Sequence, residues 1–167
     1  MSKTFRILFV CSGNSCRSPM AEGMLRAKLP PELREHVEVQ SAGTLGIEGA
    51  PATHFAIRVA YEHGANIVPH RSQGINAELV RNADLIFAMA PEHKSFIEQH
   101  YPEVRENVFL LRAFDRQSGE AFDEPIEDPI GGNLETYRSC GRLIDAELER
   151  ILPRLTQLIK ERLNPSE

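Results

Sequence analysis

Cysteine is scarce in this chain of 167 residues: there are three, which is an odd number. Small secreted scaffolds depend on many paired cysteines, so this count favours a reducing compartment and a cytoplasmic protein. The chain also lacks a long apolar run near its start. The run Ile7–Cys11 has only five residues, too few for a signal-peptide core or a membrane span, so no membrane partner is expected.

An excess of basic residues is missing as well. The chain has 24 acidic and 19 basic residues and a formal net charge of −5. Nucleic-acid binding needs a basic surface, so we expect no nucleic-acid partner, although a local pocket for one anion remains possible. No internal repeat or low-complexity stretch is present. We therefore expect one domain over residues 1–167, long enough to fold without a metal or disulfide.

Short apolar runs alternate with amphipathic segments along the chain. Four runs are expected to be strands, at residues 5–10, 37–41, 84–90 and 107–111, and five segments are expected to be helices, at residues 18–29, 51–63, 76–82, 91–100 and 134–163. This alternation predicts an α/β fold: a single doubly wound domain whose four-stranded parallel sheet has helices on both faces. Pro153 predicts a kink or a break in the last helix.

In such folds, ligands bind at the carboxyl ends of the strands, which draws attention to the loop after the first strand. This loop, residues 11–18, reads CSGNSCRS and leads into a helix N-terminus. Gly13 and Asn14 tolerate left-handed backbone angles, so the loop can aim several N–H groups at one anion. Arg17 can bind two phosphate oxygens at once. The expected phosphate-binding residues are Ser12, Gly13, Asn14, Ser15, Cys16, Arg17 and Ser18.

Cys11 begins this loop and is the candidate nucleophile. A helix N-terminus and a nearby arginine can lower a thiol pKa from about 8.5 to about 3.5–7.5, so we expect a thiolate at neutral pH. Ser18 is expected to donate a hydrogen bond to it. A simpler interpretation makes Cys11 and Cys16 small buried apolar residues. The Cys-x4-Cys spacing and the missing second ligand pair argue against zinc, so no metal is expected.

Phosphoryl transfer to a thiolate also needs an acid that protonates the leaving group. The long segment 112–132 carries several carboxyl groups, five of which are candidates, and loops of this length are usually functional or mobile. Asp128 is the candidate, because Pro129 stiffens the backbone beside it and Gly131-Gly132 follows as an expected hinge. The other four acids are expected to form a solvated loop: Asp115, Asp123, Glu124 and Glu127.

With these motifs, the sequence closely resembles the low-molecular-weight protein-tyrosine phosphatases over nearly its whole length. The stretches VCSGNSCRSPMAEG and EDPIGG match the family pattern, as do SAGT at 41–44 and PHRS at 69–72. The resemblance implies a four-stranded parallel sheet, a cysteinyl-phosphate intermediate and no metal or cofactor. It also implies Cys11 as the nucleophile, Arg17 as the group that binds phosphate and stabilises the transition state, and Asp128 as acid and then base.

The resemblance extends to supporting residues. Asn14, Ser18, Ser41 and His70 resemble a hydrogen-bond network that holds the loop, and Cys16 resembles a cysteine that forms a reversible disulfide with the nucleophile. Two positions depart from the pattern and bear on specificity. Ile130 stands where many relatives have an aromatic residue, and Ser15 stands where a branched apolar residue is common. A small hydroxyl residue there resembles bacterial protein-arginine phosphatases, which carry threonine, and arsenate reductases of the same fold.

These observations predict a cysteine-dependent phosphatase acting on phosphotyrosine proteins and other aryl phosphates. Phosphoarginine hydrolysis is the alternative. Arsenate reduction needs a relay of further cysteines, and after Cys16 the chain has only Cys140, which is expected to face the core. A non-catalytic phosphate-binding or redox-sensing module, which would not need Asp128, is a further alternative. The five histidines other than His70 are expected at the surface or at helix caps: His36, His54, His63, His93 and His100.

Overall fold

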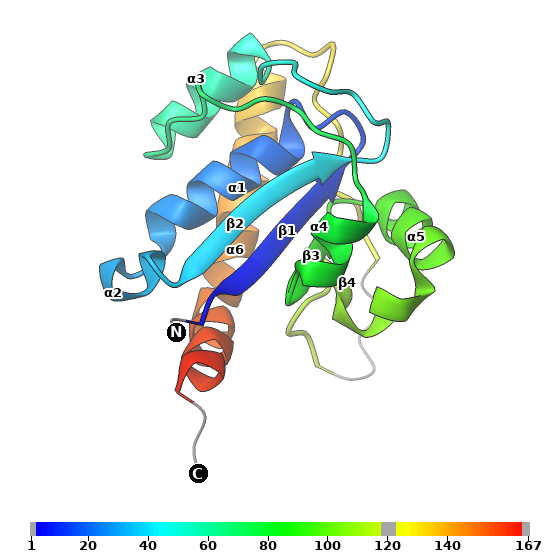
Figure 1. The fold of residues 1–167 in the computed structure, drawn as a ribbon. Helices are drawn as coiled ribbons and strands as arrows, with labels where there is room; N and C mark the ends of the chain where they lie inside the picture. The colour runs from blue at the N-terminus through cyan, green and yellow to red at the C-terminus, as the bar shows by residue number, and fades with distance from the viewer. Residues whose placement is uncertain (1–2, 118–122, 165–167) are drawn as a thin grey trace.

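The computed structural model describes residues 3–117 and 123–164, and it contains one four-stranded parallel sheet with the strand order β2-β1-β3-β4. Figure 1 shows the arrangement of the elements. In chain order they are β1 (Phe5–Cys11), α1 (Arg17–Lys28), α2 (Pro31–Arg34), β2 (Val37–Gly43), α3 (His54–Glu62), α4 (Ala77–Asn82), β3 (Leu85–Ala88), α5 (Pro91–His100), the 3-10 helix η1 (Pro102–Asn107), β4 (Val108–Leu110) and α6 (Leu134–Leu163).

The predicted fold class is confirmed: the sheet is parallel, and helices cover both of its faces. Helices α1, α3 and α6 pack together on one face, and α4 and α5 cover the other (Figure 1). The packing of the central strand β1 explains why residues 7–11 form an unbroken apolar run in the sequence. Ile7 and Phe9 face the core under α1 and α6, whereas Leu8 and Val10 face the core under α4 and α5. A parallel strand that is covered on both faces has no polar side.

The four predicted strands and the five predicted helices are present; α5 and α6 have the predicted bounds, and the other elements have shifted ends. The helix expected from residue 51 begins at His54, because the Thr53 hydroxyl caps it by accepting a hydrogen bond from the Ala56 N–H. Two short elements were not predicted, α2 and η1, and both begin at a proline. Such short elements do not show a periodic apolar pattern in the sequence.

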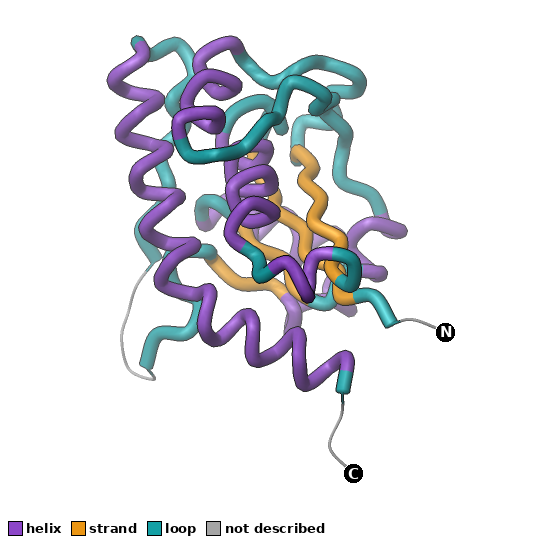
Figure 2. The backbone as a smooth tube through the Cα atoms, turned by 90° about the vertical axis from the view of Figure 1, so that its left-hand side faces the viewer, coloured by secondary structure: helices purple, strands orange, loops and turns teal. Residues whose placement is uncertain are grey.

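The last helix, α6, is one continuous element through Pro153, so the break that was one of the two expectations does not occur. Figure 2 shows that the helix changes direction along its length, as a proline inside a helix predicts. Its apolar side carries Ile144, Leu148 and Leu155, all fully buried against the rest of the core. Each such side chain stabilises the fold by about 1.5–3 kcal/mol.

Candidate active site

The loop between β1 and α1 lies at the carboxyl end of the sheet, where the strand order reverses. From β1, the chain places β2 on one side and β3 on the other. Connections therefore leave the central strand in opposite directions and open a crevice beyond its end, which is the usual ligand position in doubly wound folds. Residues 12–16 occupy this position, and α1 begins directly after them at Arg17 (Figure 1).

Asn14 holds the loop in its curled form. Its φ angle is 56°, which places it in the left-handed region, and its side chain is completely buried. The Asn14 Nδ2 donates to the Ser18 hydroxyl at 2.8 Å and to the Ser41 hydroxyl at 3.0 Å. Its Oδ1 accepts from the Gln73 N–H at 2.9 Å. The amide therefore connects the loop to α1, to β2 and to the segment after α3.

The SAGT motif supports the loop from the side, and Gly43 is the residue that permits the contact. A Cβ atom at Gly43 would lie 2.5 Å from the Ser12 carbonyl oxygen, so any other residue would displace the loop. The two residues after it bind the loop backbone. The Thr44 N–H donates to the Cys11 carbonyl at 2.9 Å, and the Leu45 N–H donates to the Ser12 carbonyl at 3.0 Å.

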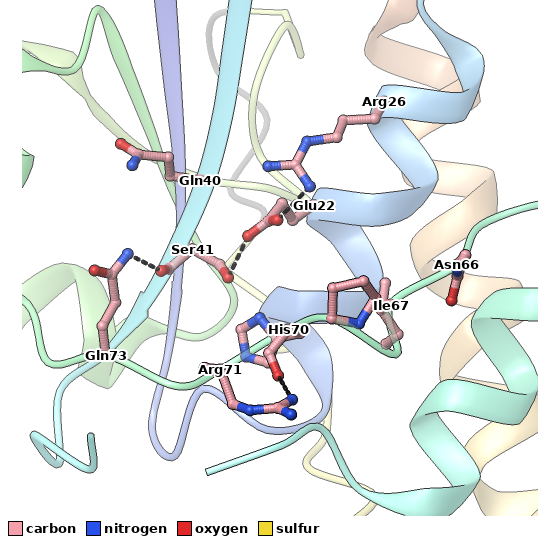
Figure 3. A pocket seen from close by; sticks show the side chains of 10 residues that line it. Glu22, Arg26, Gln40, Ser41, Asn66, Ile67, His70, Arg71 and Gln73 are labelled. Atoms are coloured by element: carbon pink, nitrogen blue, oxygen red, sulfur yellow. Dashed lines mark hydrogen bonds and ion pairs between the residues drawn. The ribbon is translucent and has the colours of Figure 1, made fainter. Parts of the chain in front are cut away.

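A second layer of polar groups lies behind the loop, along a cavity of about 280 Å³ (Figure 3). Ser41 donates to the Glu22 carboxylate at 2.7 Å, and Glu22 forms an ion pair with Arg26 at 2.6 Å. His70 Nε2 lies 2.8 Å from the Asn14 carbonyl oxygen. Ser41 and His70, which were singled out by the resemblance, thus both contact Asn14.

Cys11 ends β1 with its sulfur at the floor of the loop. Its Sγ lies 2.9 Å from the Ser18 hydroxyl oxygen. Because that oxygen already accepts a hydrogen bond from Asn14, the Ser18 proton is available for the sulfur. The N–H groups of Ser18 and Asn14 also point at the sulfur. A negative charge on Cys11 would therefore be surrounded by donors.

The expected low pKa of Cys11 needs a correction. The thiol is completely buried, and burial raises its pKa above the ordinary value, because a charged sulfur loses contact with water. The Ser18 hydroxyl, the N–H groups of Ser18 and Asn14, and the Arg17 guanidinium all act in the opposite direction, but together they are outweighed. The sequence shows the helix N-terminus and the arginine, but it does not show how deeply the fold buries the sulfur.

Arg17 is the first residue of α1, and it is buried, with only 3% of its surface exposed. Its Nη1 donates to the Ile126 carbonyl at 2.9 Å, which fixes the direction of the guanidinium. Its Nη2 lies 3.4 Å from the Ser12 hydroxyl and 3.5 Å from Asp128 Oδ2. Its Nε is buried without a hydrogen-bond partner among the described residues. A buried donor of this kind is costly unless an acceptor binds, and an oxyanion would supply one.

Asp128 comes from the distant segment before α6 and lies over the loop. Its Oδ1 accepts a hydrogen bond from the Ile130 N–H at 3.1 Å, and its carboxylate is partly exposed. Ile126 anchors this segment, because its N–H donates to the Met89 carbonyl at the end of β3. Gly131, which was expected as part of a hinge, adopts a left-handed φ of 83° in the turn that leads to α6.

The other four candidate acids lie away from the cavity over the loop, as expected. Asp115, Asp123, Glu124 and Glu127 are exposed, and Glu124 forms an ion pair with Arg112. Residues 118–122 of this segment lie outside the described residues. Of the five candidate acids, Asp128 is therefore the one that lines the cavity.

A family model, described as low molecular weight phosphotyrosine protein phosphatase, matches residues 6–163 of the chain. The chain belongs to this family. Two relatives illustrate its range. The low molecular weight protein-tyrosine-phosphatase Etp of Escherichia coli is 43% identical over 151 residues, which cover 90% of this chain and 95% of that one. A protein-arginine-phosphatase of Geobacillus stearothermophilus is 38% identical over 151 residues, which cover 90% and 96%.

Solved structures show the same fold. The YwlE arginine phosphatase from Geobacillus stearothermophilus has a TM-score of 0.83 at 36% identity and covers 98% of this chain and 99% of its own. Vibrio vulnificus Wzb in complex with benzylphosphonate has a TM-score of 0.77 at 30% identity and covers 90% and 98%. The chain is therefore a phosphatase of this family, and the resemblance seen in the sequence is confirmed.

The cavity over the loop has a volume of about 190 Å³ and largely apolar walls. Ile130, which was singled out as a specificity position, forms part of the wall and is 61% exposed. Leu45 and Ile47 form another part and were not predicted. Their only signal in the sequence is their position directly after the SAGT motif. Exposed large apolar side chains at the rim of a cavity indicate contact with a partner or substrate.

Ser15 and Cys16 also line this cavity. The Cys16 Sγ lies 3.4 Å from the Thr53 hydroxyl and 3.4 Å from the Tyr137 hydroxyl, and burial together with Cys16 raises the pKa of Tyr137 to about 12. All three cysteines are free. Cys140 is buried, as expected, and lies beneath the carbonyl of Glu127.

His93 was expected at the surface or a helix cap, and this prediction is wrong. It lies in the first turn of α5 with 1% exposure, and its Nε2 is 2.8 Å from the Ser12 hydroxyl. The sequence conceals this contact because 81 residues separate the two side chains. Within residues 3–117 and 123–164, no group of three or more potential metal ligands is found, and no helix there is both long and apolar enough to cross a membrane.

Proposed function

We propose that this protein hydrolyses phosphotyrosine on proteins, and other aryl phosphate monoesters, through a cysteinyl-phosphate intermediate. One observation carries the proposal: the sulfur of Cys11, the guanidinium of Arg17 and the carboxylate of Asp128 line a single small cavity. A nucleophile, a binding group for a dianion and a proton donor are the three parts that this reaction requires. Residues 1–167 would act as one phosphatase domain that needs no cofactor.

In the first step, the buried Cys11 thiol transfers its proton to the Asp128 carboxylate, which lines the same cavity. The resulting thiolate attacks phosphorus, a sulfur–phosphorus bond forms, and the bond from phosphorus to the phenolic oxygen breaks. Protonated Asp128 donates its proton to that oxygen, so the product leaves as a neutral phenol. Arg17 and the N–H groups of the loop bind the equatorial phosphoryl oxygens, and the buried Nε of Arg17 then gains an acceptor. The hydrogen bonds from Ser18 and the loop stabilise the thiolate that starts the reaction.

In the second step, water attacks the phosphorus of the intermediate. Asp128, now a carboxylate, accepts a proton from this water, and the sulfur leaves as a thiolate. The Ser18 hydroxyl, 2.9 Å from the sulfur, stabilises this leaving group. Inorganic phosphate departs, and the proton on Asp128 returns to Cys11, which restores the starting protonation state.

The apolar rim supports an aryl substrate. Leu45, Ile47 and Ile130 stand around the opening above the polar loop. A phenyl ring buries its faces against such side chains, whereas a guanidinium keeps several N–H donors that need acceptors. This contrast favours phosphotyrosine over phosphoarginine.

Phosphoarginine on proteins is the second candidate, and Ser15 is the observation that favours it. Ser15 is a small hydroxyl residue that lines the cavity, and its side chain leaves room and an acceptor for a donor group on the substrate. The arginine phosphatases among the relatives support the same possibility.

The proposal includes redox control and a cytoplasmic location. Cys11 and Cys16 are both free and lie in the same loop, so oxidation would join them in a reversible disulfide. Free buried thiols persist in a reducing compartment, which supports a cytoplasmic location.

The test compares kcat/KM for matched peptides that carry either phosphotyrosine or phosphoarginine. We expect the phosphotyrosine peptide to be the better substrate, and Cys11→Ser to abolish turnover of both. A large excess for phosphoarginine would replace the first candidate by the second. In that case Ser15→Ile, which removes the hydroxyl and narrows the cavity, should reduce the phosphoarginine rate more than the phosphotyrosine rate. Turnover of neither peptide would contradict both candidates.

A further inference from the structure

His93 makes a buried contact with the phosphate-binding loop that the mechanism above does not use. The residue lies in the first turn of α5, and α5 follows β3, the neighbour of β1 in the sheet. Its Nε2 is 2.8 Å from the Ser12 hydroxyl oxygen, and its side chain is almost entirely buried. Ser12 directly follows the nucleophile, so this contact links a second helix to the reacting end of the loop.

The second ring nitrogen decides which atom of His93 carries the proton. Nδ1 is buried and has no hydrogen-bond partner among the described residues. A proton on Nδ1 would therefore be an unsatisfied buried donor, whereas a proton on Nε2 has the Ser12 oxygen as its acceptor. The geometry thus favours the neutral tautomer with the proton on Nε2.

This tautomer fixes the Ser12 hydroxyl as well. The Ser12 oxygen accepts from His93 Nε2 and from Arg17 Nη2, which is 3.4 Å away. A hydroxyl oxygen has two lone pairs, so both acceptor positions are used, and its own proton must point elsewhere. Ser12 lines the cavity that also holds Cys11 and Asp128. With the opposite tautomer, Ser12 would donate to His93 and present a lone pair to the substrate.

We propose that His93 is a positioning residue: by donating from Nε2 to Ser12, it turns the Ser12 hydroxyl proton toward the bound phosphoryl group and keeps Arg17 Nη2 against Ser12. The inference rests on the proposed phosphatase function and adds to it a donor that the loop backbone does not supply. Ser12 touches the phosphoryl oxygens, and His93 acts through Ser12. A preorganised donor of this kind stabilises the transition state because it needs no reorientation during the reaction.

The surroundings of His93 keep the ring neutral. Burial, helped by the Arg17 guanidinium, lowers the pKa of His93 to about 4, although the carboxylates of Glu92 and Asp128 act in the opposite direction. At neutral pH the ring therefore has one N–H, and the position of that N–H is decided by the contact with Ser12.

The direct test is the tautomer of His93. In protein labelled with ¹⁵N at its histidines, two-bond proton–nitrogen spectra distinguish a proton on Nε2 from one on Nδ1, and the His93→Gln variant assigns the signal. We expect the Nε2–H form at neutral pH, both with and without inorganic phosphate. Finding the Nδ1–H form would overturn the proposal. This measurement needs no turnover, so it separates the inference from the proposed function.

Two variants test the contact with Ser12 kinetically. The amide nitrogen of His93→Gln reaches about as far as the imidazole Nε2, whereas that of His93→Asn reaches only as far as Nδ1. With para-nitrophenyl phosphate, we expect His93→Asn to lower kcat by about tenfold or more with KM little changed, and His93→Gln to retain most of the activity. Equal loss in both variants would contradict a role for the Nε2 donor. His100→Gln, on the exposed end of the same helix, is the control and should leave kcat unchanged.

A double-mutant comparison shows whether His93 acts through Ser12. Ser12→Ala alone should lower kcat by about 10²–10³, the range for loss of one transition-state donor. In the Ser12→Ala background, His93→Asn should cause little further loss, because the hydroxyl that it positions is gone. Fully additive losses would mean that His93 affects the rate by another route. If the parent enzyme turns over no aryl phosphate, the proposed function fails, while the tautomer still decides the inference.

Discussion

The carboxylate of Asp128 and the guanidinium of Arg17 form an ion pair across the cavity, with Oδ2 and Nη2 3.5 Å apart. The two residues come from segments more than a hundred positions apart. The backbone of Ile126, two residues before Asp128, brings these segments together: its carbonyl accepts a hydrogen bond from Arg17, and its N–H donates to Met89 and so anchors the segment to the sheet. This ion pair places Asp128, the proposed acid, beside Arg17, the group proposed to bind the phosphoryl oxygens. A phosphoryl dianion that binds Arg17 then lies directly against Asp128.

Asp128→Asn should therefore have two opposite effects. Turnover of aryl phosphates with poor leaving groups should fall by roughly 10²–10⁴, because general acid catalysis is lost. Binding of tungstate, measured by calorimetry, should become tighter, since a negative charge next to the anion is removed. Glu127→Gln makes the same change of charge on the neighbouring exposed residue and should alter neither quantity appreciably. An unchanged rate in Asp128→Asn would favour another acid or a module that only binds phosphate.

Ser18→Ala should raise the pKa of Cys11 further. The Ser18 hydroxyl lowers this pKa by its hydrogen bond to the sulfur, so its removal leaves the charged form less stable. The pH dependence of alkylation by iodoacetamide measures the shift, and Ser15→Ala, in the same loop, serves as the control for this pKa. Because a hydrogen bond to a charged group is worth about 1.5–3 kcal/mol, turnover at neutral pH should fall by about tenfold to a hundredfold. A pKa that stays constant or falls would show that Ser18 does not donate to the sulfur.

Cys16 should protect Cys11 from irreversible oxidation. Hydrogen peroxide oxidises the Cys11 thiolate to a sulfenic acid with release of hydroxide, and the Cys16 thiol then attacks the sulfenic sulfur and displaces water to form the disulfide. Dithiothreitol should restore the parent enzyme, whereas Cys16→Ser should accumulate sulfinic acid and stay inactive. Cys140→Ser should behave like the parent. Mass spectra of the oxidised parent that show sulfinic acid without a Cys11–Cys16 bond would contradict this role.

Stability should depend on pH through His93. Its pKa is about 4 in the folded protein and about 6.5 when unfolded, so between these values the unfolded chain binds the proton and the folded chain does not. The free energy of unfolding should therefore fall as the pH drops from about 6.5 to about 4, by up to about 3 kcal/mol from this group. Urea unfolding of the parent and of His93→Gln at several pH values measures the difference. The same slope in both proteins would show that His93 does not contribute.

Sequence reasoning succeeded where the determinants are local. The loop 11–18 contains within eight residues the proposed nucleophile, the left-handed residue and the arginine, so its type of chemistry can be inferred from residue type alone. The alternation of strands and helices likewise predicted the parallel sheet. Asp128 could be proposed from Pro129 beside it, although its place over the cavity depends on the anchoring of Ile126 to the end of β3.

What the sequence determines by itself is a strand, a loop and a helix that together can hold an anion above a cysteine, because the residue types that favour them lie close together in the chain. Only the tertiary structure decided that His93 is buried against Ser12, that Leu45 and Ile47 stand at the rim of the cavity, and that burial raises the pKa of Cys11. Each of these depends on how segments far apart in sequence pack and exclude water. The pattern of residues along one segment carries no record of that packing.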